Sequence, residues 1–246
     1  MPSEILQNEN IRKALLFGID REELCAAVLN GAATPAVGVV PNGIAVNPET
    51  GASIAEDWGS LVSFDPEAAQ AYLAKGLEEL GVDSISLRLV TSDTDESVKI
   101  GTYLQSAYEK NLPGLTIDLA NVPSSVRFVE MMSYDFDLAL GGWTGDYDPT
   151  SYPNQFETSY PHNHAQWQSE ELTALINALN YEDGTDFAAR WEHLRQANQY
   201  LIDNAVVVPL EQEVKGYLVN PALKGYITHQ LGNSTFDLTR AYFEAE

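Results

Sequence analysis

The chain has 246 residues, of which 44% are hydrophobic and 10% aromatic, and this is enough apolar material for a buried core. With 36 acidic residues against 13 basic ones, its formal charge is -23. Such a surface repels phosphate backbones and anionic membranes, which excludes nucleic acid as a partner. No apolar run approaches the roughly 20 residues of a membrane span. The first ten residues also lack the basic and apolar regions of a signal peptide.

The N-terminal quarter predicts two helices and a long loop. Residues 10–30 carry apolar side chains at helical spacing, interrupted at Gly18, so we expect two short helices with Asp20 as the N-cap of the second. Cys25 lies in an apolar stretch of that second helix, where a small buried side chain is expected. Residues 31–63 are rich in Gly, Pro, Ala and Asn, which favours an extended, loop-dominated segment.

Helices and strands then alternate. Asp65 is predicted to cap a helix that runs to Leu80, with Pro66 at its first position. The following elements are expected to be strands at 84–91, 115–119 and 135–141, with helices between them at 96–110 and 123–133, the latter capped near Ser124 or Ser125. This β-α-β-α-β order predicts an α/β fold with a parallel three-stranded core.

The remainder of the chain is less regular. An aromatic, proline-rich loop covers residues 143–168, and two helices are predicted at 170–180 and 185–203. A pair of short strands is predicted at 205–210 and 213–219. The tail at 220–246 has weak periodicity, and four of its side chains are apolar enough that we expect them to dock onto a surface: Phe236, Leu238, Tyr242 and Phe243.

The residues best suited to chemistry gather at 141–156, directly after the third predicted strand. They include the aromatic residues Trp143 and Tyr147 and the carboxylates Asp146 and Asp148. In open α/β sheets, ligands bind beyond the carboxyl ends of the strands. A carboxylate beside aromatic rings suits an ammonium group, through charge-assisted hydrogen bonds and cation–π contact. A Pro/Gly/Asp turn with two packed rings accounts for the same residues equally well.

Two other kinds of site compete with this interpretation. The aspartates at 146 and 148, or at 135 and 137, resemble the paired carboxylates of a glycosidase, although such pairs arise by chance in an acidic chain. His162 and His164 are two imidazoles without an evident third ligand, so a surface loop is favoured over a metal site. The sequence has no nucleophile elbow, glycine-rich phosphate loop or Cys/His nucleophile pair.

Several short segments, spread over most of the chain, carry a resemblance to a known family. They are NIRKAL and GIDRE at 10–22, GAATPA at 31–36 with VP at 40–41, DPEAA at 65–69, FDLA and GWTGDYDP at 136–149, and VPL at 208–210. In this order and at these separations, they resemble the oligopeptide- and dipeptide-binding receptors of ABC importers. These receptors form family 5 of the extracellular solute-binding proteins.

The resemblance implies a fold and a setting. We expect a periplasmic-binding-protein-like lobe of class II, with a mixed, mainly parallel β-sheet flanked by helices. Family members are about twice as long and close two lobes on their ligand. Residues 1–205 are then the C-terminal ligand-binding lobe, and residues 206–246 return toward the other lobe. The implied protein is a monomeric binding protein rather than an enzyme, needs no cofactor or metal, and is extracytoplasmic and membrane-anchored at full length. Its partners are a peptide and the importer's permease subunits.

The resemblance also implies roles for the residues of the loop. The expected ligand-binding residues are Trp143, Thr144, Gly145, Asp146, Tyr147 and Asp148. In the family the aspartate of the W-x-x-D-Y loop holds the peptide's α-ammonium group, and this role falls on Asp146. The D-Y-D-P spacing here is one residue shorter than in the family, which leaves the role of Asp148 open. Leu140 stands where an arginine precedes the tryptophan, so the resemblance assigns no anchor for a peptide's carboxyl terminus.

Other ligands and activities remain open at this point. Some members of the family bind nickel chelates, sugars such as oligosaccharides or other small solutes, and others are sensor domains. Outside the family, a carboxylate-pair hydrolase is the alternative class.

Overall fold

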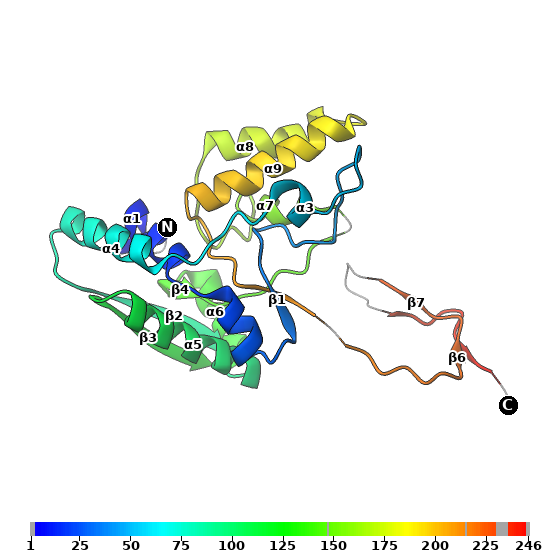
Figure 1. Cartoon of the computed structure of the whole chain (residues 1–246), viewed down its shortest axis with the longest axis horizontal. Coiled ribbons are helices and arrows are strands. Elements are labelled where there is room, and N and C mark those ends of the chain that lie inside the picture. Colours follow the sequence, from blue (N-terminus) through cyan, green and yellow to red (C-terminus); the bar gives the residue numbers. More distant parts are fainter. Residues whose placement is uncertain (1–2, 147, 215, 230–235, 245–246) are drawn as a thin grey trace.

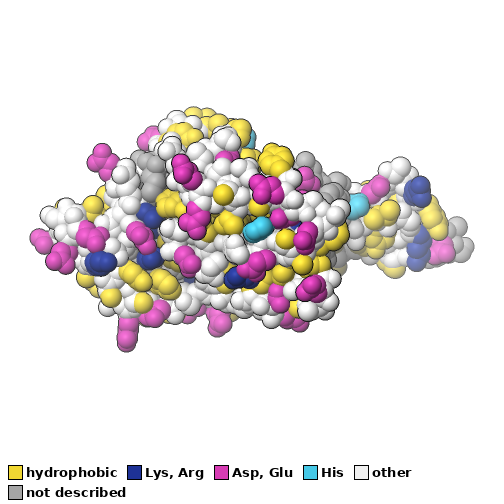
Figure 2. Space-filling view, turned by 90° about the horizontal axis from the view of Figure 1, so that it is seen from above, with side chains coloured by type: hydrophobic (Ala, Val, Ile, Leu, Met, Phe, Trp, Pro, Cys, Tyr) yellow, Lys and Arg dark blue, Asp and Glu magenta, His cyan; other side chains and the backbone are white. Residues whose placement is uncertain are grey.

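The structure is a computed structural model that describes residues 3–146, 148–214, 216–229 and 236–244. It has an α/β part and a helical part that together form a body. The described residues from 216 onward project from this body, and we call them the arm (Figure 1). Acidic side chains are spread over the face of the body seen in Figure 2, with few basic ones between them, as the charge of -23 leads us to expect.

The α/β part is built on a three-stranded parallel sheet. Its strand order is β3-β2-β4, with β2 at Ile85–Ser92, β3 at Leu115–Val122 and β4 at Leu138–Ala139. Helix α5, Asp95–Asn111, connects β2 to β3, and helix α6, Ser124–Ser133, connects β3 to β4. The predicted β-α-β-α-β core and its parallel pairing are therefore confirmed.

Strand β4 is shorter than the predicted strand at 135–141. The Asp137 side chain accepts a hydrogen bond from the Arg88 N–H at 2.8 Å, while the Asp137 N–H donates to the Arg88 carbonyl at 3.2 Å. A carboxylate thus takes one place in the ladder, so regular pairing begins only at Leu138.

The N-terminal segments pack beside this sheet. They comprise η1 at Ile5–Gln7, α1 at Glu9–Phe17, α2 at Arg21–Glu23, the π-helical turn η2 at Leu24–Val28 and α4 at Pro66–Leu80. Asp20 and Asp65 cap their helices as predicted, accepting hydrogen bonds from Glu23 N and Ala68 N. A Cβ on Gly76 of α4 would lie 2.5 Å from Ile11 Cδ1 of α1. The absence of a side chain at Gly76 therefore lets the two helices approach closely.

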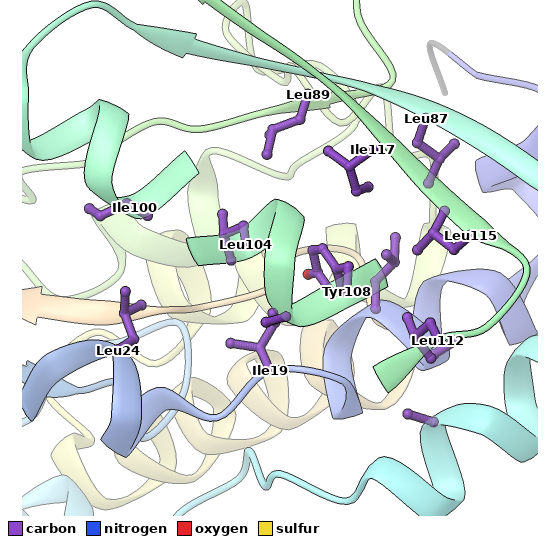
Figure 3. Close-up of a cluster of buried hydrophobic side chains, with 14 of the residues drawn as sticks. Ile19, Leu24, Leu87, Leu89, Ile100, Leu104, Tyr108, Leu112, Leu115 and Ile117 are labelled. Atoms are coloured by element: carbon purple, nitrogen blue, oxygen red, sulfur yellow. The ribbon is translucent and has the colours of Figure 1, made fainter. Parts of the chain in front are cut away.

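The main core lies between the sheet, α5 and the N-terminal helices (Figure 3). Alternate residues of the strands point into it, as the period of two requires for a sheet face. Cys25 is buried here, as predicted, and burial raises the pKa of its thiol to about 11. The labelled members of this core are Ile19, Leu24, Leu87, Leu89, Ile100, Leu104, Tyr108, Leu112, Leu115 and Ile117.

The helical part has a core of its own. It contains α3 at Ile54–Trp58, α7 at Ser151–Asn154, α8 at Glu170–Asn177, the π-helical extension η3 at Ala178–Glu182 and α9 at Phe187–Asp203. Helices α8 and α9 match the predicted pair, whereas α3 and α7 lie in segments for which we expected loops. Helix α3 has a capping box, because the Ser53 hydroxyl accepts from Glu56 N and the Glu56 carboxylate accepts from Ser53 N.

The predicted strand pair at 205–210 and 213–219 is wrong. Strand β5, Glu211–Glu213, pairs antiparallel with the distant strand β1, Ala33–Pro35. Residues 206–210 form no ladder: the Val206 N–H donates back to the Leu201 carbonyl, and Pro209 has no N–H to donate. The Leu210 carbonyl accepts from Ala36 N of the distant segment that contains β1. In the described parts of the chain, antiparallel pairing thus occurs in two-stranded ladders and in the isolated bridge between Val46 and Ser53.

The cap predicted at Ser124 or Ser125 is also wrong. Pro123 is the N-cap residue of α6 and provides no side-chain acceptor, and both serines lie inside the first turn. The proline sets the helix start through its fixed φ, here −50°, rather than through a hydrogen bond.

The arm consists of two short antiparallel ladders. Strand β6, Leu223–Lys224, pairs with β9, Tyr242–Phe243, and β7, Ile227–Thr228, pairs with β8, Phe236–Asp237. None of the arm residues that the structure describes is buried, and Tyr242 and Phe243 are 58% and 68% exposed. Of the apolar side chains that we expected to dock onto a surface, Leu238, Tyr242 and Phe243 are therefore exposed, whereas Phe236 is half-buried beside the rings of Tyr217 and Tyr226.

Candidate functional site

The candidate loop begins where β4 ends. The Leu140 N–H donates to the Val90 carbonyl at 2.8 Å, so the chain leaves the sheet at its carboxyl edge. Residues 141–144 are exposed and irregular, and Trp143 is 40% exposed. This is the position at which ligands bind to open α/β sheets.

Gly145 fixes the loop against helix α7. Its N–H donates to the Tyr152 hydroxyl at 3.2 Å, and a Cβ at this position would lie 2.2 Å from Tyr152 Cε2. The next residue, Asp146, donates its backbone N–H to Ser151 Oγ at 3.0 Å. The start of α7 therefore holds the loop, and only glycine fits at position 145. Sequence reasoning missed Ser151 and Tyr152, although they follow the loop directly.

The two aspartates of the loop have different surroundings. Asp146 is exposed, as a group that meets a ligand has to be. Asp148 accepts a hydrogen bond from Thr150 N at 3.0 Å through Oδ1 and from Arg190 Nη2 at 2.5 Å through Oδ2. Partial burial acts to raise the pKa of Asp148, but the bonds from Thr150 and the charge of Arg190 outweigh it and lower that pKa. Asp148 thus ties the loop to helix α9. Tyr147 lies outside the described residues.

A row of rings connects the loop with the segment that follows α7. The Trp143 and Tyr160 rings meet edge to face with centroids 6.3 Å apart, Tyr160 lies 6.2 Å from His162, and His162 lies 6.0 Å from His164. We refer to these four residues as the aromatic row. The described residues include no group of three or more His, Cys, Asp and Glu side chains that is arranged to hold a metal ion.

A pocket of about 550 Å³ borders the aromatic row at Tyr160. Asn163 shapes its wall, because its side chain donates to the Trp167 carbonyl at 2.9 Å and accepts from the Trp167 N–H at 3.3 Å. The Arg12 guanidinium stacks over the Trp167 ring at 5.0 Å. The pocket lining contains amides, hydroxyls and rings but no charged side chain: Gln7, Tyr134, Thr158, Tyr160, Asn163, Gln166, Trp167 and Gln168.

Sequence reasoning did not find this pocket. Its lining comes from three separated segments, near residues 7, 134 and 158–168. No local pattern connects a residue before α1 with the end of α6. The one partial signal was the density of aromatic and amide residues at 158–168.

Comparison with known proteins identifies the family. A family model described as "Bacterial extracellular solute-binding proteins, family 5 Middle" matches residues 1–164. The chain belongs to this family. The family 5 chain is 33% identical to the dipeptide-binding protein of Lactococcus lactis subsp. cremoris, over 97% of this chain and 44% of that protein. It is 31% identical to the oligopeptide-binding protein OppA of Bacillus subtilis, over 97% of this chain and 43% of OppA.

Solved structures give the same fold. An oligopeptide ABC transporter substrate-binding domain from Bacillus anthracis superposes on this family 5 chain with a TM-score of 0.89, at 29% identity, over 98% of this chain and 46% of that one. OppA of Listeria monocytogenes bound to peptide superposes with a TM-score of 0.86 at 27% identity, over 99% of this chain and 46% of that OppA chain. The periplasmic-binding-protein-like fold expected from the resemblance is confirmed.

The chain spans less than half the length of these curated relatives. A peptide-binding protein of a peptide ABC transporter matches it at similar length, with 31% identity and a TM-score of 0.81 over 85% of this chain and 92% of that one. In the described parts of the family 5 chain, no helix is both long and apolar enough to span a membrane.

Proposed function

We propose that this chain is the ligand-binding lobe of a peptide receptor that delivers its ligand to an ABC importer. The observation that supports this most directly is the exposed Asp146, held on a glycine-fixed loop beside Trp143 at the carboxyl edge of the sheet. The names of the relatives, dipeptide- and oligopeptide-binding proteins, point to the same ligand class.

Recognition on this proposal has two parts. Asp146 binds the peptide's α-ammonium group, and the Trp143 ring with the backbone of Thr144 and Gly145 flanks the first residues of the peptide. Main-chain hydrogen bonds to an extended peptide provide affinity that tolerates many sequences. The neutral pocket beside Tyr160 suits varied side chains, because its amides and hydroxyls both donate and accept hydrogen bonds.

The proposal extends to the rest of the receptor. Residues 1–205 belong to one lobe, and residues 206–246 lead toward a second lobe that covers the exposed apolar side chains of the arm. The full-length protein is a monomer, works outside the cytoplasm, is anchored to the membrane and meets the permease when its lobes close by a hinge motion. It is a binding protein and not an enzyme.

The alternative functions have less support. A carboxylate-pair hydrolase requires a second carboxylate free to act beside Asp146, whereas both oxygens of Asp148 are engaged by Thr150 and Arg190. No observation favours a nickel chelate or an oligosaccharide over a peptide, and the relatives that match this chain are named for peptides.

The decisive experiment is calorimetric titration of peptides into a full-length receptor. Such a receptor contains this chain together with the remaining half that its relatives have. Asp146→Ala is expected to weaken binding by about 2–5 kcal/mol, since a desolvated ammonium group loses its partner. Acetylation of the peptide's N-terminus removes the same ammonium group, so it should cost the wild type a similar amount and the variant little.

Asp83→Ala is the matched control. It removes the same charge from an exposed aspartate that precedes β2, at the opposite edge of the sheet, and should leave the affinity unchanged. Equal affinity of the wild type and Asp146→Ala would remove Asp146 from this role.

A further inference from the structure

Two aromatic rings are exposed at the end of a helical hairpin. Helix α8 and its extension η3 pack against α9, and residues 181–187 join them; we call these residues the hairpin tip (Figure 1). Tyr181 is 81% exposed and Phe187 is 61% exposed. The value for Tyr181 is the highest of any large apolar side chain among the described residues of the body. Exposed rings of this size are side chains that protein interfaces bury.

The hairpin tip has a fixed shape. The Asp183 side chain is 5% exposed, and its Oδ1 lies 3.0 Å from His193 Nδ1 on α9. Asp186 caps α9 by accepting from Ala189 N at 3.0 Å, and its own N–H donates to the Asp183 carbonyl at 2.7 Å. The helix widens to the π-helical turn η3 just before the tip, a distortion that is frequent at functional sites. The two rings are therefore presented by an ordered structure.

The hairpin tip is also acidic. Residues 178–189 contain the carboxylates Glu182, Asp183 and Asp186 and no lysine or arginine. Asp183 and Asp186 are engaged within the hairpin, whereas Glu182 is exposed. A partner that covers the two rings therefore needs an apolar surface with basic side chains beside it. A second copy of this chain fits poorly, because its charge of -23 repels the acidic tip.

The position of the hairpin tip suits a surface that reports closure. Helix α9 begins at the tip and ends beside residues 206–210, which lead toward the arm (Figure 1). Its 17 residues span about 25 Å at 1.5 Å per residue. When two lobes close by a hinge motion about the segment that joins them, the parts farthest from that segment move most. The tip lies one full helix length from that segment.

The hairpin tip is connected to the candidate loop. Arg190, three residues after Phe187, forms the ion pair with Asp148 at 2.5 Å. Before the tip, Asn180 Nδ2 donates to Asn154 Oδ1 of α7 at 3.2 Å. Both ends of the tip are thus attached to the elements that hold the loop, so the tip and the loop move together.

We propose that the hairpin tip is a docking surface for the importer's permease, with Tyr181 and Phe187 as its anchors and Glu182 beside them. The inference rests on the proposed function and deepens it, because it names the part of this lobe that meets the permease. The matching permease surface is an apolar depression bordered by Lys or Arg side chains. Because the tip moves far when the lobes close, contact there lets the permease distinguish a closed, loaded receptor from an open one.

The test uses the full-length receptor and its importer, reconstituted in proteoliposomes, and measures ATP hydrolysis against receptor concentration. The receptor carries the peptide that it binds most tightly in the calorimetric titration. The double variant Tyr181→Ser/Phe187→Ser should need about 10- to 100-fold more receptor for half-maximal stimulation, the loss expected when interface anchors are removed. Its affinity for the peptide should equal that of the wild type. Glu182→Lys should also weaken stimulation, by a factor that shrinks as salt is added.

Two matched controls keep the hairpin tip intact. Phe64→Ser removes a ring that is 41% exposed in the segment before α4, and Glu67→Lys reverses an exposed charge on α4 itself. Both variants should stimulate ATP hydrolysis at the same receptor concentration as the wild type.

The outcomes separate the docking surface from the proposed function. Unchanged stimulation by the double variant would overturn the docking surface while peptide binding stands. A parallel loss of peptide affinity would assign the rings to the receptor's own second half, and a change in oligomeric state would assign them to a second copy. Either result also overturns the proposal. Failure of every peptide to bind would overturn the proposed function and the docking surface together.

Discussion

At the scale of single residues, neighbours in the candidate loop have distinct tasks. Asp146 and Asp148 are the same type of residue two positions apart, yet Asp146 is exposed and Asp148 is held by Thr150 and Arg190. Gly145 is buried against Tyr152. The loop thus combines one exposed carboxylate with two residues that fix its shape, and a fixed shape is what a preorganised binding site requires.

Substituting Gly145 tests how the loop is held. Gly145→Ala places a Cβ 2.2 Å from the Tyr152 ring and should lower the free energy of unfolding by about 1–3 kcal/mol, the usual cost of overpacking. Gly142→Ala is the matched control, because nothing lies within 4 Å of its Cβ. Urea unfolding of both variants measures the difference. Equal stability would mean that Tyr152 moves aside without cost.

The ion pair between Asp148 and Arg190 should make stability depend on acid pH. The folded pKa of Asp148 is lowered from its ordinary 3.8, so its contribution is present above that value and is lost as the pH falls through the lowered pKa. The side chain is 49% exposed, so solvent screening limits the contribution to less than about 1 kcal/mol. A double-mutant cycle with Asp148→Asn and Arg190→Gln should give a coupling energy at pH 7 that decreases as the pH is taken below 3.8. A coupling that is unchanged by acid would contradict the assignment.

At the scale of elements, local end signals decided where most helices begin. Asp20 and Asp65 cap their helices as the sequence predicts, and Gly81 ends α4 in the left-handed region at φ 70°. Helix α3 has an equally clear signal in Ser53 and Glu56, within a segment whose Gly and Pro content favoured a loop. Helix α6 begins at Pro123, where the fixed φ replaces a side-chain cap.

The cap of α4 gives a prediction at this scale. Asp65→Ala removes the acceptor for the Ala68 N–H at 2.9 Å and should lower the free energy of unfolding by about 1 kcal/mol. Asp65→Asn keeps an acceptor, and Asn caps helices as well as Asp does, so this variant should lower the free energy of unfolding by only about 0.3 kcal/mol. Thermal and urea unfolding measure both. A loss of equal size in the two variants would assign the effect to charge and not to capping.

At the scale of the whole molecule, the body is packed and the arm is not. Residues 206–210 contact the body cores through Val206, Val207, Val208 and Leu210, and β5 pairs with β1. Beyond that point, no described residue is buried. The division that we expected between 205 and 206 stays a prediction, because a contact with a second lobe is what defines it.

Two truncations test this organisation. Deletion of residues 216–246 should leave the melting temperature of the body unchanged, because none of the described residues that it removes is buried. It should also reduce the binding of a hydrophobic dye, because it removes exposed apolar side chains such as Tyr242 and Phe243. Deletion of residues 206–246 also removes β5 and the valines that pack on the cores, and should lower the melting temperature by several degrees. A large destabilisation by the shorter deletion would show that the arm supports the body.

Much of the fold was readable in advance because its signals are local. Alternating apolar residues, caps and the β-α-β-α-β order predicted the parallel sheet and its helices. The pairing of β5 with β1 was not readable, because its partners are almost 180 residues apart and short strands carry little pattern. The shortening of β4 was missed for a related reason, since it depends on the Asp137 side chain taking a place in the ladder.

The sequence by itself determined the family, the class of fold and the loop at 141–148, because each is recorded in residues that are close together along the chain. Only the tertiary structure decided which described side chains of that loop are exposed, where the neutral pocket lies, and that Arg127 meets the end of β4. These features join segments that are distant in sequence, and their geometry follows from how the helices pack against the sheet. Packing depends on the shapes of many side chains at once, which no local pattern contains.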